Sequence, residues 1–160
     1  MKIKQNNVTS TVNDYEIVSW GPKYSVGIKL IDDQHMELVN LTNQLYQACL
    51  SKEKSVEEVF KEAMHRMVDY VRMHFSTENL LLESVGFPNY REHKKLHETL
   101  VKDILTAVKN YEDGNKLVPI HFARTLKDWI FSHIAICDQI YAQYIHEQIK
   151  NGVLDKKQLE

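Results

Sequence analysis

The sequence predicts an all-α protein, an up-down-up-down antiparallel four-helix bundle with an extended N-terminal arm. Apolar residues recur at steps of three and four along four long segments, which is the spacing of one face of a helix. The 160-residue chain holds only 5 Gly and 3 Pro, too few turn formers for a many-stranded sandwich or barrel. Short links between the segments make sequential helices antiparallel neighbours.

The composition excludes several classes of function. Lys and Arg number 20 and Asp and Glu number 22, so a net charge of −2 offers no electrostatic footprint for nucleic acid or an anionic membrane. No apolar run approaches the roughly 20 residues that span a bilayer. The polar segment Met1–Ser10 lacks the apolar core of a signal peptide, so we expect a cytoplasmic protein. Cys49 and Cys137 make no disulfide framework.

Three segments organise the chain. We expect an N-terminal arm at 1–30, a four-helix bundle at 31–152 and a C-terminal tail at 153–160. The β-prone pieces of the arm have no regular partner, so an extended segment lying on the bundle is favoured over a sheet.

The first two helices have recognisable ends. Helix one is expected to start near Asp32, because acidic residues suit a helix N-terminus, and to run to about Leu50. Helix two opens at Ser55 with a capping-box pattern and stops at Gly86. The predicted inward positions are His35, Leu38, Thr42, Leu45 and Cys49, then Phe60, Ala63, Met67, Tyr70, His74, Thr77 or Glu78, and Leu81.

The last two helices follow the same logic. Helix three opens at Asn89, three residues before a glutamate, and ends near Gly114. Helix four begins near Pro119, a good first-turn residue, and ends near Gly152. The predicted inward positions are Tyr90, His93, His97, Leu100, Ile104, Ala107 and Tyr111, then Phe122, Leu126, Trp129, His133, Ile136 or Cys137, Ile140 and Tyr144.

Five of the 8 histidines fall on these inward faces, and all four helices contribute at least one. A buried imidazole must find partners for its nitrogens, and an apolar bundle interior offers few. A metal ion supplies one. The inward histidines are His35, His74, His93, His97 and His133, whereas His65, His121 and His146 lie off these faces or at their edge.

Carboxylates accompany the histidines. Glu78 follows His74 by four residues, so both project from one helical face, and no inward cation is visible to pair with Glu78. Asp138 follows His133 by five residues, a rotation of roughly 140° on an ideal helix. Spacing alone therefore does not place these two on one face, and Cys137 fits the spacing better.

The ligand types point to iron. A structural zinc site usually contains cysteines. A ferritin-like site needs two Glu-x-x-His motifs, and the one that occurs, Glu62 to His65, lies off the inward faces. Five imidazoles and two carboxylates suit a pair of iron ions better than calcium or magnesium.

Four motifs resemble the hemerythrin family, in particular its single-domain bacterial members, across about Trp20 to Ile149. They are Ile31-Asp-Asp-Gln-His35, His74-Phe-Ser-Thr-Glu78, His93-x-x-x-His97 and Trp129-Ile-Phe-Ser-His133-Ile-Ala-Ile-Cys-Asp138. The resemblance favours Asp138 over Cys137. It implies one iron held by His93, His97 and His133, a second held by His35 and His74, and Glu78 and Asp138 bridging both beside an oxo or hydroxo group.

The resemblance implies reversible dioxygen binding by a carrier or store that is not an enzyme. Apolar residues beside the ligands are expected to form the oxygen pocket: Leu38, Phe75, Trp129, Ile130 and Ile134. The alternatives are an oxygen or redox sensor acting through a partner and an oxidoreductase acting on peroxide or nitric oxide. Asn79 stands where the family often has a second glutamate. We expect a monomer that binds no nucleic acid and has no membrane span, and the sequence does not identify a protein that receives the oxygen.

Overall fold

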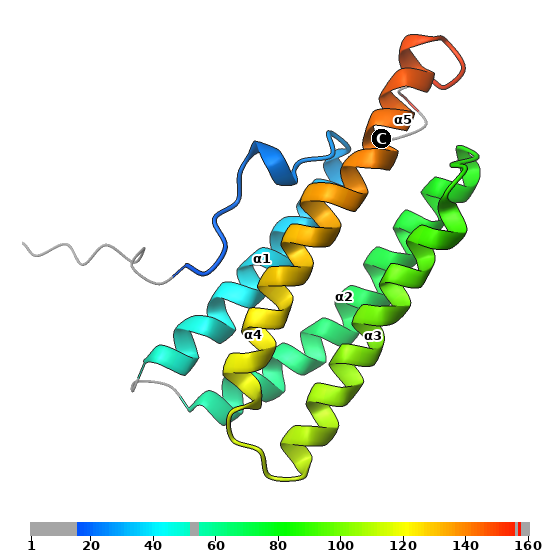
Figure 1. Ribbon diagram of the computed structural model, residues 1–160. Coiled ribbons are helices and arrows are strands. Elements are labelled where there is room, and N and C mark those ends of the chain that lie inside the picture. Colours follow the sequence, from blue (N-terminus) through cyan, green and yellow to red (C-terminus); the bar gives the residue numbers. More distant parts are fainter. Residues whose placement is uncertain (1–15, 52–54, 156, 158–160) are drawn as a thin grey trace, which may run out of the picture.

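Four rods form the bundle in the predicted order, each antiparallel to the one before it (Figure 1). The computed structural model describes residues 16–51, 55–155 and 157. The rods are α1 (Lys29–Leu50), α2 (Val56–Ser84), α3 (Tyr90–Glu112) and a fourth that joins α4 (Val118–Trp129), the π-helical segment η2 (Ile130–Cys137) and α5 (Asp138–Lys150). Both α1 and α3 pack against α2 and α4, so the rods enclose one interior. The described residues contain no strand, and the all-α prediction is confirmed.

The helix ends follow most of the predicted signals. The Ser55 hydroxyl accepts a hydrogen bond from the amide of Glu58 (3.4 Å) and caps α2. At the other end of α2, Gly86 has a φ of 65°, a conformation that favours glycine. Asn89 precedes α3 but does not cap it with its side chain. Its φ of −96° and ψ of 23° lie outside the extended region from which a capping side chain faces the first-turn amides.

The fourth rod departs from the predicted α-helix within η2. There the backbone bonds from i to i+5, as in the hydrogen bond from the amide of Asp138 to the carbonyl of His133. Each such turn takes one more residue than an α-turn, so the inward face shifts along the sequence. Ile136 and Ile140, predicted to point inward, are 50% and 55% exposed, while Cys137 and Tyr144 are half-buried. The buried residues beyond η2 are Asp138, Tyr141, Ala142 and Ile145.

The described part of the arm, residues 16–28, lies on the bundle and contains the 3₁₀ turn η1 (Pro22–Tyr24). The Asn43 side chain holds it to α1, because it accepts from the amide of Val18 (3.0 Å) and donates to the carbonyl of the same residue (2.8 Å). Residues 1–15 of the predicted arm, and residues 156 and 158–160 of the predicted tail, lie outside the described residues. The segment boundaries themselves stay predictions.

The start of α1 is also tied to the arm. The helix begins at Lys29, earlier than predicted, and the Asp32 carboxylate accepts hydrogen bonds from the Ser25 hydroxyl (2.6 Å) and the amide of Val26 (2.7 Å). Asp32 therefore anchors the arm instead of marking the first residue of the helix.

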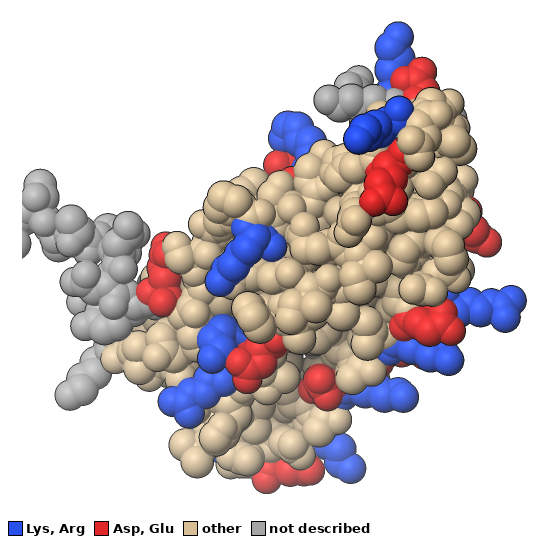
Figure 2. All heavy atoms as spheres, turned by 45° about the horizontal axis from the view of Figure 1, so that its top comes forward, with Lys and Arg blue, Asp and Glu red and all other residues tan. Residues whose placement is uncertain are grey.

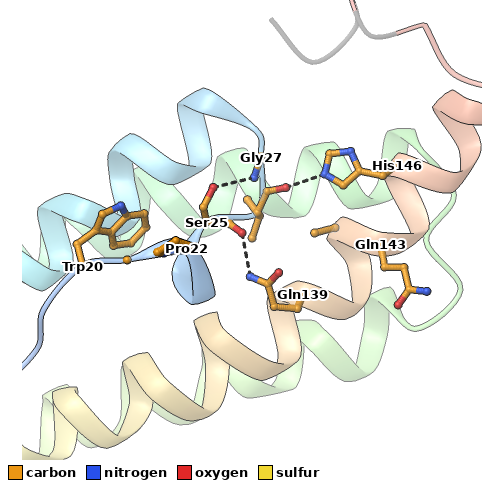
Figure 3. A pocket seen from close by; sticks show the side chains of 10 residues that line it. Trp20, Pro22, Ser25, Gly27, Gln139, Gln143 and His146 are labelled. Carbon is orange, nitrogen blue, oxygen red and sulfur yellow. Dashed lines mark hydrogen bonds between the residues drawn. The ribbon is translucent and has the colours of Figure 1, made fainter.

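The arm also reaches α5 across an open groove of about 790 Å³ (Figure 3). Gln139 donates to the carbonyl of Ser25 (3.2 Å), and the His146 ring donates to the carbonyl of Val26 (3.0 Å). These contacts fix the arm over the fourth rod.

Two apolar clusters divide the interior. The larger surrounds Leu38, Tyr70 and Leu100, and the smaller surrounds Ile31, Leu82 and Tyr141. Along α1 and α2 the boundary between them lies at the predicted histidine positions, so polar groups there are enclosed by hydrocarbon on both sides.

Charged side chains of both signs are interspersed on the face shown in Figure 2, without a continuous basic area. Within the described ranges, no helix combines the length and apolarity that crossing a bilayer requires. Cys49 and Cys137 are both half-buried free thiols.

Candidate metal centre

Seven predicted ligands from all four rods meet in the middle of the bundle. None is more than 5% exposed, although every one is polar or ionisable. They are His35 on α1, His74 and Glu78 on α2, His93 and His97 on α3, His133 on η2 and Asp138 at the start of α5.

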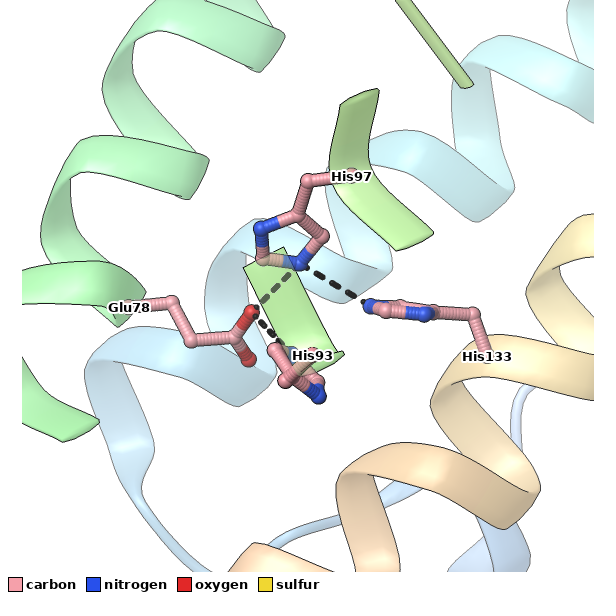
Figure 4. A group of neighbouring side chains, drawn as sticks. All are labelled: Glu78, His93, His97 and His133. Carbon is pink, nitrogen blue, oxygen red and sulfur yellow. Dashed lines mark hydrogen bonds and ion pairs between the residues drawn. The ribbon is translucent and has the colours of Figure 1, made fainter. Parts of the chain in front are cut away.

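One group of four converges on the Glu78 carboxylate (Figure 4). Glu78 Oε2 lies 3.1 Å from His93 Nε2 and 2.9 Å from His97 Nε2. His133 Nε2 lies 3.0 Å from His97 Nε2. The ligand atoms of these four residues all lie within 4.8 Å of one another, close enough to bind a single ion.

A second group consists of His35, His74 and the same Glu78. Their ligand atoms also lie within 4.8 Å of one another. Because Glu78 belongs to both groups, its carboxylate stands between two candidate metal positions.

Asp138 occupies a corresponding place on the opposite rod. Its Oδ1 lies 3.2 Å from His133 Nε2 and 3.5 Å from His93 Nε2, whereas its Oδ2 lies 3.3 Å from His35 Nε2. One oxygen thus faces each group. Asp138 and Cys137 both lie outside the two groups of ligand atoms, but only Asp138 is fully buried with its oxygens close to histidines of both, whereas Cys137 is half-buried.

The local backbone explains these positions. His74 and Glu78, like His93 and His97, are four residues apart in regular α-helices and therefore project from one face. His133 and Asp138 are five apart, and the i→i+5 bonding of η2 brings them to one face. An ideal α-helix would not place these two side chains on one face.

Several ligand atoms have no hydrogen-bond partner among the described residues. Burying such atoms without partners is costly, so a group from outside the polypeptide is expected to satisfy them. The unpartnered atoms of the centre are His35 Nδ1 and Nε2, His74 Nε2, His97 Nδ1, and both oxygens of Asp138. Metal ions would satisfy the inward-facing nitrogens and oxygens together.

Four of the imidazoles, those of His35, His74, His97 and His133, are in the protonation state that metal binding requires. Burial lowers the pKa of His35 to about 4 and that of His74 to about 3. Burial also lowers the pKa of His97 and of His133. These rings are therefore neutral at pH 7, and a neutral ring offers a lone pair to a metal.

The two buried carboxyl groups have only histidines as partners within ion-pair distance in the described part of the chain. Burial and the nearby charge of Glu78 raise the pKa of Asp138 well above its usual range. Burial opposes ionisation of Glu78 as well, but His74, His93 and His97 outweigh it and hold its pKa well below the usual range. Among the described residues no Lys or Arg pairs with either carboxylate, so a bound cation would relieve their repulsion.

Two residues that sequence reasoning missed support the ligands. Gln34 Oε1 accepts a hydrogen bond from His74 Nδ1 (2.9 Å), which leaves Nε2 of that ring free for a metal. The Tyr141 hydroxyl donates to Glu78 Oε1 (2.5 Å). Tyr141 follows Asp138 by three residues, so the two share a helical face. A π-turn before Asp138, had it been recognised in the sequence, would have predicted that both point inward.

The five residues predicted for the oxygen pocket belong to one apolar cluster, and two of them contact candidate ligand rings. Phe75 stacks on His97 with ring centroids 3.8 Å apart, and Trp129 stacks on His133 at 4.2 Å. The other three, Leu38, Ile130 and Ile134, are fully buried in the same apolar cluster. Their role as a pocket stays a prediction.

The remaining histidines lie away from the centre. The side chains of His65 and His121 are exposed, as is Glu62, so the Glu-x-x-His motif takes no part in it. His146 contacts the arm. Asn79 is half-buried and is not one of the seven candidate ligands.

The chain is similar in sequence and in fold to known proteins. Residues 26–145 match the family described as Hemerythrin HHE cation binding domain. The chain is 30% identical over 139 residues to bacteriohemerythrin of Pseudomonas aeruginosa (strain LESB58), covering 87% of this chain and 88% of that protein. It is 31% identical over 130 residues to bacteriohemerythrin of Stenotrophomonas maltophilia (strain R551-3), covering 81% and 82%. The crystal structure of a hemerythrin mutant shares the fold, with a TM-score of 0.71 at 23% identity over 80% of this chain and 96% of that one.

Proposed function

The chain belongs to the hemerythrin family, and from that premise we propose that it binds dioxygen reversibly at a di-iron centre, as a carrier or store and not as an enzyme. The observation that carries the proposal is the burial of seven candidate ligand side chains in the bundle. Several of their nitrogen and oxygen atoms have no hydrogen-bond partner, and no described Lys or Arg pairs with their carboxylates.

The ligand set divides between two ions. His93, His97 and His133 would hold one iron, His35 and His74 the other, and the two carboxylates would bridge both. The placement of Glu78 in both groups supports this division, as does the orientation of the two Asp138 oxygens. An oxo or hydroxo bridge, implied by the family, would complete the set.

The ligand count leaves room for one exogenous ligand. Two six-coordinate ions offer about twelve positions, of which this set and the bridge fill about eleven. The remaining position would fall to the ion held by His35 and His74. When bound, the iron pair supplies the electrons for reversible combination with dioxygen.

The chain's own residues would keep that position dry. Leu38, Ile130 and Ile134 enclose the interior with hydrocarbon, while Phe75 and Trp129 cover two ligand rings. By excluding water and stray protons, these side chains would protect a bound metal pair from irreversible oxidation, which a carrier requires.

Iron content and the visible spectrum test the proposal. We expect two irons per chain and a charge-transfer band that appears in air, disappears when oxygen is removed and returns over repeated cycles. A band that decays rapidly to an oxidised form would favour a sensor, and catalytic consumption of peroxide or nitric oxide would favour an oxidoreductase. Either result would contradict the carrier assignment.

The monomeric state and the cytoplasmic location expected from the sequence are also part of the proposal. Light scattering of the iron-loaded protein and fractionation of cells test them separately from oxygen binding.

A further inference from the structure

Tyr70 carries a buried hydroxyl that forms no hydrogen bond with the described part of the chain. Its side chain is only 2% exposed. Leaving such a group unpaired costs free energy, whereas a phenylalanine would fill nearly the same space without that cost. The hydroxyl therefore indicates a partner that the polypeptide does not provide.

The Tyr70 ring lies directly against the candidate metal centre. It stacks on the ring of His74, with centroids 4.9 Å apart and planes 19° apart, and it meets the Phe75 ring edge-on at 6.4 Å. Tyr70 precedes His74 by one turn of α2, and helical side chains lean toward the N-terminus of their helix. The hydroxyl thus belongs to the layer just beyond the ligand histidines.

The neighbouring rods contribute leucines to that layer. Because α1 and α3 run antiparallel to α2, the residues one turn after their histidines lie at the level of Tyr70. These residues are Leu38, which follows His35, and Leu100, which follows His97, and both are fully buried. Thr42, one turn beyond Leu38 on α1, is also fully buried, but its hydroxyl already donates to the carbonyl of Leu38 (2.8 Å). A buried water needs two to four polar partners, which these side chains do not supply.

We propose that the Tyr70 hydroxyl donates a hydrogen bond to the small ligand at the free coordination position beside His35 and His74. Tyr70 would then determine specificity by favouring ligands that accept a hydrogen bond over those that do not. This inference rests on the proposed function, because it requires the metal pair. It also adds one polar donor to a pocket that the sequence predicted to be lined by apolar residues.

Replacement of Tyr70 by phenylalanine tests the proposal with azide, a small anion that accepts hydrogen bonds. The Tyr70→Phe change removes one oxygen and keeps the ring that stacks on His74, so the iron content should stay at that of the wild type. The matched control is Tyr111→Phe, which removes the same atom from a half-buried ring that packs on Phe60 (4.6 Å) at the far end of α3.

Two measurements separate a ligand-binding hydroxyl from a structural one. Titration of the oxidised, iron-loaded proteins should show azide bound about tenfold more weakly by Tyr70→Phe, equal to about 1.4 kcal/mol, and unchanged in the control. Denaturant unfolding of the metal-free chain should show Tyr70→Phe at least as stable as the wild type, because it loses only an unpaired group.

Other outcomes overturn the inference. Unchanged or tighter azide binding by Tyr70→Phe would do so. Loss of stability in the metal-free variant, or failure to fold, would show that the hydroxyl has a structural partner. If the wild type holds no iron pair, the proposed function fails as well. If the wild type binds the iron pair and azide, and the variant binds azide equally, only the role of Tyr70 is wrong.

Discussion

Deleting Ile136 from η2 tests whether the π-helical segment serves only to accommodate one extra residue between His133 and Asp138. On an ideal α-helix, five residues rotate by roughly 140° beyond a full turn and four by roughly 40°. The deletion shortens the step from His133 to Asp138 from five residues to four. A plain α-helix would then hold both side chains on the inward face, so we expect the variant to fold and bind metal.

The magnitude follows from the exposure of the deleted residue. Ile136 is 50% exposed, so its loss removes about half of a side chain's burial, about 1 kcal/mol, and regained i→i+4 hydrogen bonds offset part of it. The control is deletion of Arg124, an exposed residue of α4. That deletion turns the buried Val118 and Phe122 by about 100° and should cost about 3–6 kcal/mol.

Denaturant unfolding and iron analysis check both deletions. The Ile136 deletion should unfold within about 1 kcal/mol of the wild type and keep its full iron content, while the Arg124 deletion should lose both stability and iron. Equal damage from the two deletions would refute the idea that η2 only corrects the register.

Three further results are expected. Glu78→Ala should lose at least one iron per chain in metal analysis, while the exposed control His65→Ala should keep both; full loading of the Glu78 variant would contradict its bridging position. Tyr141→Phe should lower the unfolding free energy of the metal-free chain by about 1.5–3 kcal/mol, because it removes a hydrogen bond to a buried carboxylate. Because the folded-state pKa values of His35 and His74, about 4 and 3, lie below the unfolded value near 6.5, the unfolded chain binds more protons between these values. The free energy of unfolding of the metal-free chain should therefore fall as the pH drops from 7 to 4. The raised pKa of Asp138 acts in the opposite direction, but the imidazoles whose pKa is lowered outnumber it. A denaturation midpoint that does not change with pH would contradict this prediction.

The helices and most of the centre could be predicted because the signals are local. Ser55 caps α2 through its neighbour three residues on, and the His74–Glu78 and His93–His97 pairs share faces because four residues make about one α-turn. Such patterns depend only on the backbone geometry of one helix.

The sequence spacing could not place Asp138, and it predicted the wrong inward residues beyond it. The reason is that i→i+5 bonding in η2 changes the period that the spacing argument assumes. The resemblance to a known family identified Asp138 where the periodicity favoured Cys137, but it did not explain how the backbone brings the residue to the centre.

By itself, the sequence determined the four helices, their antiparallel order and the ligand types that make iron the expected metal. Only the tertiary structure decided which side chains support those ligands. Tyr141 bonds to Glu78 across 63 residues of sequence and Gln34 bonds to His74 across 40, while the Tyr70 hydroxyl has no hydrogen-bond partner among the described residues. These relations depend on how separate rods are rotated against one another, and the periodicity of a single helix does not specify that rotation.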